Sequence, residues 1–156
     1  MKRRLIVSLG TILTIAAVVA GCSKDAITDS LSISYGAITV GMEKKDGKPN
    51  LNANITVRMI NRTEQGMNVA FIEGTIIDAK TNQAIARFRP IIPQSYGTIS
   101  SAQLLPKQKK DIPVITPPEL EPFTTTVANV IVKISFQTTD GYRTEVASGP
   151  VPVASK

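Results

Sequence analysis

The residues of this chain that could take part in covalent chemistry are few. Cys22 is its only cysteine, and it stands at the end of an apolar N-terminal stretch, directly after Ala20 and Gly21. The sequence contains no histidine, which removes the commonest general base, the Ser-His-Asp triad and ordinary zinc sites. What remains is a scatter of carboxylates and one short run of lysines.

The N-terminal segment has the parts of a secretory signal peptide. A basic start at residues 2–4 is followed by an uncharged, mostly apolar stretch at residues 5–20, and small residues precede Cys22. The apolar stretch is shorter than the roughly 20 residues that a membrane-spanning helix needs. A plain signal peptide with a chance cysteine is the alternative, but it would leave a secreted protein with one unpaired thiol.

The run Val19-Ala20-Gly21-Cys22 resembles the lipobox of bacterial lipoproteins. The resemblance implies cleavage between Gly21 and Cys22 and a diacylglycerol on the Cys22 thiol, with two or three acyl chains such as palmitate in all. That number of chains anchors a protein stably. An acylated Cys22 is available neither as a nucleophile nor for a disulfide. The resemblance also favours the outer membrane if the source is Gram-negative, because position 23 is serine and not aspartate.

We therefore expect three parts: a cleaved signal peptide at residues 1–21, a lipidated tether at residues 22–30 and one folded domain at residues 31–154. The part of the tether after Cys22 can span at most ~28 Å, so the domain must lie close to its bilayer. Cleavage removes three basic residues and no acidic one, which lowers the formal net charge from +6 to +3. A weakly basic chain with little basic-aromatic interleaving does not indicate a nucleic-acid partner.

Alternation of apolar and polar residues dominates the mature sequence. The odd positions are apolar in residues 51–59, and the even positions are apolar in residues 128–136. A period of two predicts antiparallel strands with one face in the core and the other in solvent. A further strand begins at Leu31, and its alternation changes parity at Gly36, which predicts a β-bulge there.

Turn signals separate the expected strands. Asp140-Gly141 predicts a hairpin turn between two alternating segments, and residues 45–50 and 78–82 are expected to join other strand pairs. Seven of the ten prolines lie between Pro90 and Pro122. Because proline has no amide hydrogen, this region is expected to hold loops and short edge strands.

About seven to eight strands in one domain are typical of a β-sandwich. We predict an all-β fold, an antiparallel Greek-key β-sandwich of the immunoglobulin-like kind, with an α+β fold or a small barrel as the alternative. Ser100–Leu105 is the one segment expected to form a turn of helix. The segments Asn61-Arg62-Thr63, Gly74–Asp78 and Phe136–Tyr142 are similar to turn motifs of small immunoglobulin-like or fibronectin III-like modules in bacterial lipoproteins. The chain has neither the disulfide nor the tryptophan of true immunoglobulin domains.

The basic run of Lys107, Lys109 and Lys110 has two interpretations. The first is contact with an anionic surface, such as phospholipid headgroups, lipopolysaccharide or an acidic partner. The second, which we favour, is protection of an edge strand, because lysines there discourage pairing between sheets. Arg87 and Arg89, on either side of Phe88, allow the same two interpretations.

No pattern in the sequence predicts an enzyme, a metal or a cofactor. Calcium would need a loop with several oxygen ligands, and none is present. The candidate acid–base carboxylates all fall in or beside turns or a proline-rich loop: Glu43, Asp46, Glu64, Asp78, Glu119, Glu121 and Asp140.

The function expected from the sequence is that of a non-catalytic, membrane-anchored lipoprotein of the bacterial cell envelope, serving as a binding or structural accessory module. Its partners would be the membrane, through the N-terminal lipid, and an envelope protein. The alternative is a periplasmic or surface lipoprotein that binds a lipid, a glycan or a small molecule directly.

Overall fold

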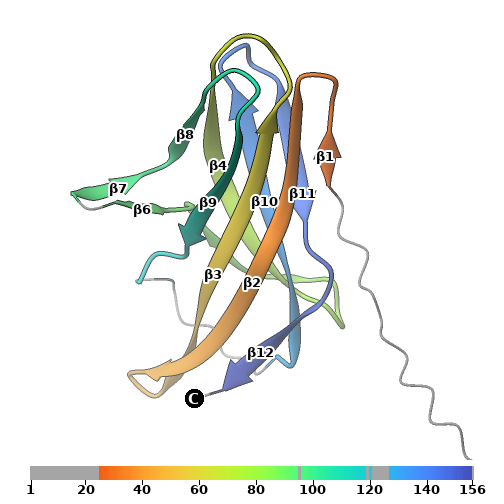
Figure 1. Cartoon of the computed structure of the whole chain (residues 1–156). Helices are drawn as coiled ribbons and strands as arrows, with labels where there is room; N and C mark the ends of the chain where they lie inside the picture. The colour runs from red at the N-terminus through yellow and green to blue at the C-terminus, as the bar shows by residue number, and fades with distance from the viewer. Residues whose placement is uncertain (1–24, 95, 119, 121–126, 156) are drawn as a thin grey trace, which may run out of the picture.

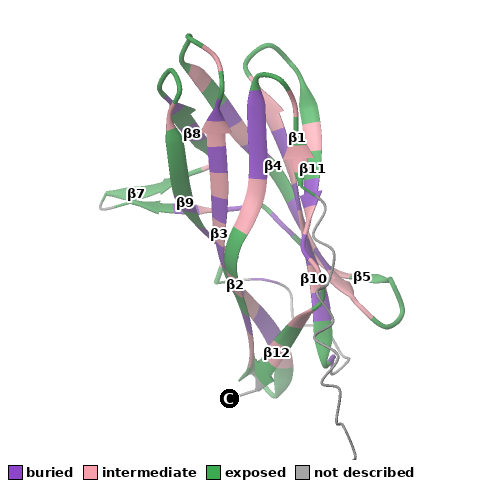
Figure 2. Ribbon diagram, turned by 45° about the vertical axis from the view of Figure 1, so that its right-hand side comes forward, coloured by how far each residue is buried: buried purple, intermediate pink, exposed green. Residues whose placement is uncertain are grey.

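The two most regular alternating segments form long strands in opposite layers of a β-sandwich (Figure 1). The computed structural model describes residues 25–94, 96–118, 120 and 127–155. Every second residue is buried from Leu51 to Met59 in β3 (Lys48–Asn61) and from Val130 to Phe136 in β10 (Asn129–Thr138). Figure 2 shows this alternation of buried and partly exposed residues along β3. The period-two pattern therefore places one face of each strand in a shared core.

The first layer is built on β10 and its neighbours. Its other strands are β4 (Met67–Asp78), β5 (Ala84–Phe88), β8 (Ser101–Leu104) and β11 (Arg143–Ala147). The second layer is built on β3, and its other strands are β1 (Ala26–Ile27), β2 (Leu31–Lys45) and β9 (Lys109–Ile115). The chain crosses between the layers from β3 to β4, from β8 to β9 and from β9 to β10, which produces a non-sequential, Greek-key strand order.

Two elements connect or extend these layers. β12 (Val151–Ser155) pairs antiparallel with β10 and parallel with β2, so it joins the layers along one side. β6 (Ile92–Gln94) and β7 (Gly97–Ile99) form a two-stranded hairpin that projects from the sandwich (Figure 1). We call this hairpin the arm.

The core is apolar, and a few polar contacts fix its layers. The rings of Phe71 in β4 and Phe136 in β10 meet edge to face, with centroids 5.0 Å apart. The Tyr35 hydroxyl donates to the Val146 carbonyl oxygen at 2.9 Å, which ties β2 to β11. Burial raises the pKa of Tyr35, so this hydroxyl stays protonated and keeps donating.

The predicted bulge and turns are present. The register of β2 against β3 shifts between Tyr35 and Ile38, which places the extra residue at the Gly36 bulge. Asp46 and Gly47, with φ of 52° and 77°, connect β2 to β3. Gly141 has a φ of 87° in the turn between β10 and β11. Positive φ costs glycine little, so the sequence signals and the backbone agree at these turns.

The all-β sandwich is confirmed, but three details of the prediction are wrong. The described residues contain twelve strands rather than seven or eight, because strands of two or three residues, such as β1, β6 and β7, are too short to show alternation. The sheet is not wholly antiparallel, because β12 runs parallel to β2. Ser100–Leu105 contains β8 and no helical turn.

The paired backbone also extends into the segment expected to be a tether. Ala26 and Ile27 pair with Ile33 and Ser32. The intervening turn is closed by Thr28, whose backbone amide and hydroxyl both donate to the Leu31 carbonyl oxygen, at 2.8 and 3.0 Å. Pairing therefore begins four residues after Cys22.

Candidate functional site

Gly21 and Cys22, the residues of the expected cleavage and lipidation site, lie outside the described residues. The described chain begins at Asp25, next to β1. Figure 1 shows β1 on the side of the sandwich opposite the arm. Within the described ranges, the structure has no helix long and apolar enough to cross a membrane.

The structure does not gather the three lysines of the basic run on one surface. Lys107 lies in the β8–β9 loop with a φ of 54°, and its Nζ donates to the Arg62 carbonyl oxygen at 2.7 Å. The same Nζ lies 3.0 Å from Glu64 Oε1. Lys109 and Lys110 are exposed on β9, where neighbouring side chains point to opposite faces. β9 ends the strand order of the large sheet, a position that agrees with edge protection.

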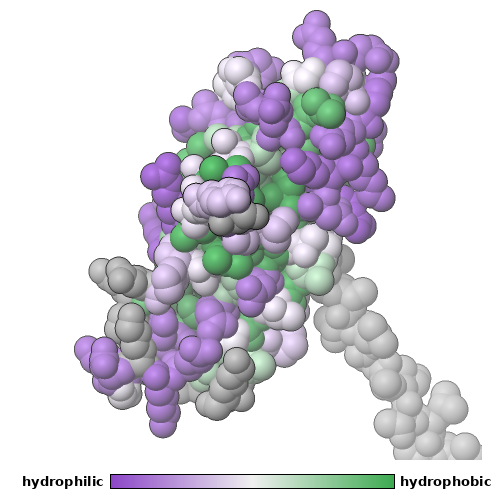
Figure 3. Space-filling model, turned by 60° about the vertical axis from the view of Figure 1, so that its left-hand side comes forward, coloured by the Kyte–Doolittle hydropathy of each residue, from purple (hydrophilic) through white to green (hydrophobic). Residues whose placement is uncertain are grey.

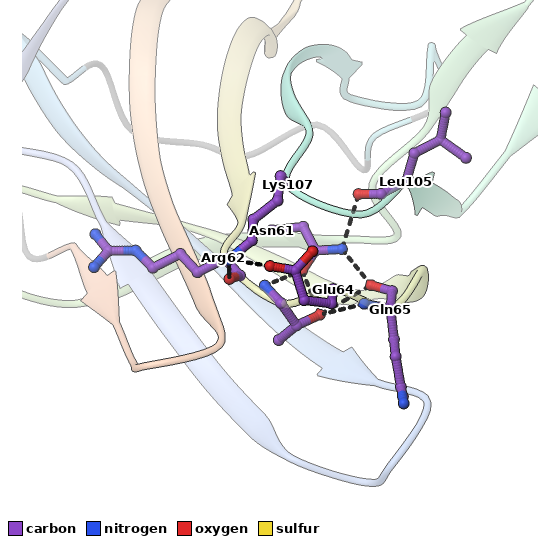
Figure 4. Close-up of polar contacts among 7 residues, drawn as sticks. Asn61, Arg62, Glu64, Gln65, Leu105 and Lys107 are labelled. Carbon is purple, nitrogen blue, oxygen red and sulfur yellow. Dashed lines mark hydrogen bonds and ion pairs between the residues drawn. The ribbon is translucent and has the colours of Figure 1, made fainter.

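Asn61 is hydrogen-bonded to the two loops beside Lys107, the β3–β4 loop and the β8–β9 loop (Figure 4). It lies at the end of β3 and is only 1% exposed. Its Nδ2 donates to the carbonyl oxygens of Gln65, at 2.7 Å, and Leu105, at 2.8 Å. Its Oδ1 accepts from the backbone amide and the hydroxyl of Thr63, both at 2.9 Å. The buried amide is therefore fully hydrogen-bonded, and it holds the β3–β4 loop against the β8–β9 loop.

A depression of about 860 Å³ opens beside these loops. It lies between the β1–β2 loop, the β3–β4 loop and the β10–β11 turn, and its apolar surface comes in part from Met67 and the half-exposed Tyr142. Hydroxyl and amide groups dominate the rest of its lining, which includes Thr28, Ser30, Thr63, Gln65, Asn68, Gln103, Thr138 and Thr139. We call this depression the loop basin. Sequence reasoning missed it because its lining comes from segments that are distant in the chain.

The aspartates of two turns stabilise those turns. The backbone amide of Lys80 and the hydroxyl of Thr81 both donate to the Asp78 carboxylate, at 2.9 Å each, and these bonds lower the pKa of Asp78. The hydroxyl of Thr138 donates to the carboxylate of Asp140 and lowers its pKa in the same way.

A third aspartate belongs to an ion pair on the outer face of β3 and β9. Arg58 Nε and Nη2 donate to the two carboxylate oxygens of Asp111, at 2.9 and 3.0 Å. This hydrogen bonding lowers the pKa of Asp111. Glu119 and Glu121 lie outside the described residues, and those residues contain no group of three or more side chains of the metal-ligating types His, Cys, Asp and Glu.

The lowered pKa values of Asp78, Asp111 and Asp140 predict how the protein responds to acid. A carboxyl whose pKa is lower in the folded state stabilises that state above its unfolded pKa of about 3.9, and loses this effect as pH falls through the folded value. We expect the urea midpoint to be insensitive to these groups between pH 7 and about pH 5 and to fall below about pH 4. Asp111→Asn should make the fall below pH 4 smaller, and an unchanged acid dependence in this variant would contradict the assignment.

The residues Arg87, Phe88 and Arg89 differ in how far they are buried. Arg87 and Arg89 are exposed, whereas Phe88 between them is 6% exposed. Phe88 pairs with Gly74 across β4 and β5, and a Cβ on Gly74 would lie 2.2 Å from Phe88 Cζ. Arg89 Nη2 donates to Ser100 Oγ at 3.3 Å. Phe88 is thus a core residue, and the two arginines are its solvated neighbours.

A second opening lies where the two layers separate. A groove of about 560 Å³ is bounded by β8, β9 and the arm, and we call it the edge groove. Figure 3, which brings the arm side forward, shows apolar side chains around the base of the arm. Its described lining includes Ile92, Pro93, Ile99, Ala102, Gln103, Lys110, Asp111, Ile112 and Pro113. The sequence analysis singled out the prolines and the lysines of this region. It could not predict that Pro93, Pro113 and Lys110 line the same groove.

Comparison with known proteins identifies the fold and no family. No protein-family model matches the chain, and no curated protein matches it. Among solved structures, the apo PCuAC domain of PmoF2 is similar, with 9% identity and a TM-score of 0.51, over 83% of this chain and 94% of that one. A FixG-related protein from Vibrio parahaemolyticus matches with 12% identity and a TM-score of 0.42, over 81% of this chain and 98% of that one. At these identities the similarity concerns the β-sandwich alone.

Proposed function

We propose that this chain is a lipid-anchored module of the bacterial cell envelope that binds a partner or supports an assembly without catalysing a reaction. The observation that carries the proposal is the position of Cys22 at the end of a lipobox-like run, four residues before the first paired strand. Four residues span at most ~14 Å. A lipid on Cys22 would therefore hold the sandwich directly against the bilayer.

The roles of three described aspartates support the non-catalytic part of the proposal. Asp78 and Asp140 close turns, and Asp111 is held by Arg58. Each of these three pKa values is lowered, whereas a carboxylic acid that donates a proton near neutral pH needs a raised one. The groups are thus suited to stabilise the fold.

Substitution of Cys22 tests the anchor. We expect the full-length wild-type chain, expressed in a bacterial host, to stay in the membrane fraction after a carbonate wash and to incorporate an alkyne analogue of palmitate. Cys22→Ser should lose both properties, because serine offers no thiol for the lipid, and nearly all of the protein should become extractable. Ser23→Ala is the matched control, and it should behave as the wild type. A Cys22→Ser protein that stays membrane-bound to the wild-type extent would contradict the proposal.

A second candidate function is direct binding of a small ligand, and the loop basin favours it. The basin combines many hydroxyl and amide groups with Tyr142 and the carboxylates of Asp29 and Asp140, a composition suited to a polyhydroxylated molecule such as a glycan. Native mass spectrometry of the protein released gently from its membrane distinguishes the two. A stoichiometric bound glycan or small molecule would place this function first.

A further inference from the structure

We propose that the edge groove receives an extended acidic segment of a partner protein, which lies between β8 and β9 as an added β-strand and pairs along β9. The inference deepens the proposed binding role and rests on that part of the proposed function. Four observations carry it: the outward edge of β9 and the outward edge of β8, with which no described strand pairs, the prolines that end the pairing between the arm and β9, and the charge around the groove.

The outward edge of β9 carries unpaired hydrogen-bonding groups. In an antiparallel strand, successive residues direct their backbone groups to opposite sides. Gln108 and Thr116 bond to β3 through the Asn61 amide and the Ala53 carbonyl oxygen, so the even positions face β3. The odd positions, which include Lys109 and Asp111, face away from it. No described strand pairs with these two residues on that side.

The outward edge of β8 faces the same groove. The Ser100 carbonyl oxygen accepts from the Phe71 amide at 2.8 Å, so residues 100, 102 and 104 direct their backbone groups to β4. Ser101 and Gln103 therefore direct theirs away from β4. The Gln103 carbonyl oxygen accepts from Lys110 Nζ across the groove at 3.4 Å. Two strand edges thus border one opening, and an extended backbone matches such edges better than a helix or a lipid does.

Two prolines stop the arm from closing this opening. Ile91, the residue before the arm, exchanges backbone hydrogen bonds with Ile115 at 3.1 and 2.8 Å, which is the first step of an antiparallel ladder toward β9. Continued by two residues in each strand, the ladder would pair Pro93 with Pro113. Neither proline has an amide hydrogen, so the ladder ends there. The arm therefore leaves residues 109–112 of β9 unpaired on this side. Proline here determines where the edge is free.

The charge around the groove favours an occupant with negatively charged side chains. Lys110 lines the groove and is exposed, on the side of β9 whose Ile112 and Val114 are buried. Lys109 is exposed on the opposite face of the same strand. Among the described lining residues, Asp111 is the only acidic one, and its charge is neutralised by Arg58. The described surroundings of the groove therefore carry a positive charge over an apolar floor. An occupant with alternating acidic and apolar side chains is complementary to both.

Peptide binding to the full lipidated chain in detergent micelles tests the proposal. The probes are a ten-residue peptide of alternating glutamate and valine and a counterpart of alternating lysine and valine. We expect the acidic peptide to bind at least ten times more tightly than the basic one at low salt, and to slow amide exchange in residues 100–104 and 108–112. The edge strand β5 serves as the internal control, and its exchange should not change.

Variants separate backbone pairing from charge. Lys109→Pro removes an outward amide without touching the β3 ladder, and should reduce binding at least tenfold beyond Lys109→Ala, which keeps the amide. Lys110→Glu should also weaken binding at least tenfold, and it tests the charge even if the proline variant does not fold.

Equal affinity for both peptides, equal binding by the proline and alanine variants, or unchanged exchange at both edges would overturn the proposal. Concentration-dependent protection of the same edges without peptide would also overturn it, because a second copy would then be the occupant. The Cys22→Ser experiment uses no groove residue, so the two proposals can fail independently.

Discussion

Asn61→Asp should lower the free energy of unfolding by about 3–5 kcal/mol, since it removes two buried donors and buries a carboxylate. The change keeps the shape of the side chain. The carbonyl oxygens of Gln65 and Leu105 lose their hydrogen from Nδ2 and instead face a negative oxygen. The burial of Asn61, at 1% exposure, leaves little room for water to replace the lost bonds.

The loss should depend on pH in a defined direction. Burial beside two carbonyl oxygens disfavours the charged form of the new aspartate, so its pKa in the folded variant should lie above the unfolded value. The folded variant then binds protons more readily, and lowering the pH should recover part of the lost stability. Urea unfolding at pH 7 and pH 5 measures this recovery.

Asn54→Asp is the matched control, because Asn54 lies on the same strand and is exposed. This variant should change the unfolding free energy by less than about 0.5 kcal/mol. If Asn61→Asp were as stable as Asn54→Asp, Asn61 would not hold the loops together.

Gly74→Ala should cost about 2–4 kcal/mol, because the new methyl group occupies the place of the Phe88 ring. The added Cβ would lie 2.2–2.6 Å from three ring atoms of Phe88, so the ring must leave its buried position. Gly74 is in the middle of β4 and has no positive φ. Contact with the ring, and not backbone freedom, explains why glycine is present there.

A double-mutant cycle separates the ring contact from other effects. Phe88→Ala alone should destabilise by about 3–5 kcal/mol through the lost burial. On this background, Gly74→Ala should be neutral or stabilising, because alanine costs less conformational entropy than glycine. Thermal or urea unfolding of the four proteins gives the coupling energy. Additive effects of the two substitutions would contradict the contact.

The sequence predicted the parts of the fold that repeat a local pattern. β3 and β10 alternate over many residues, and Asp140-Gly141 favours a positive φ. β6 and β7 have three residues each, which is too short for a period to be visible. The parallel pairing of β12 with β2 depends on the assembled layers, since it joins strands from the two ends of the domain.

The candidate sites needed the tertiary structure for the same reason. In the sequence, Asn61 has the pattern of an ordinary turn residue. Its hydrogen bond to the Leu105 carbonyl oxygen could not be predicted because the two residues are 44 positions apart. The lysines were expected at a strand edge, and Lys109 and Lys110 lie on one. That Pro93 and Pro113 fall opposite each other depends on the register between the arm and β9, which no local pattern encodes.

The mass of the mature N-terminal peptide tests the lipid anchor most directly. The full-length chain would be purified from the membranes of a bacterial host, digested with protease and analysed by mass spectrometry. Our account predicts a peptide that begins at Cys22 and carries the added mass of a diacylglycerol, with or without a further acyl chain on the amino group. A peptide that retains Gly21, or one in which Cys22 bears a free thiol, would contradict it.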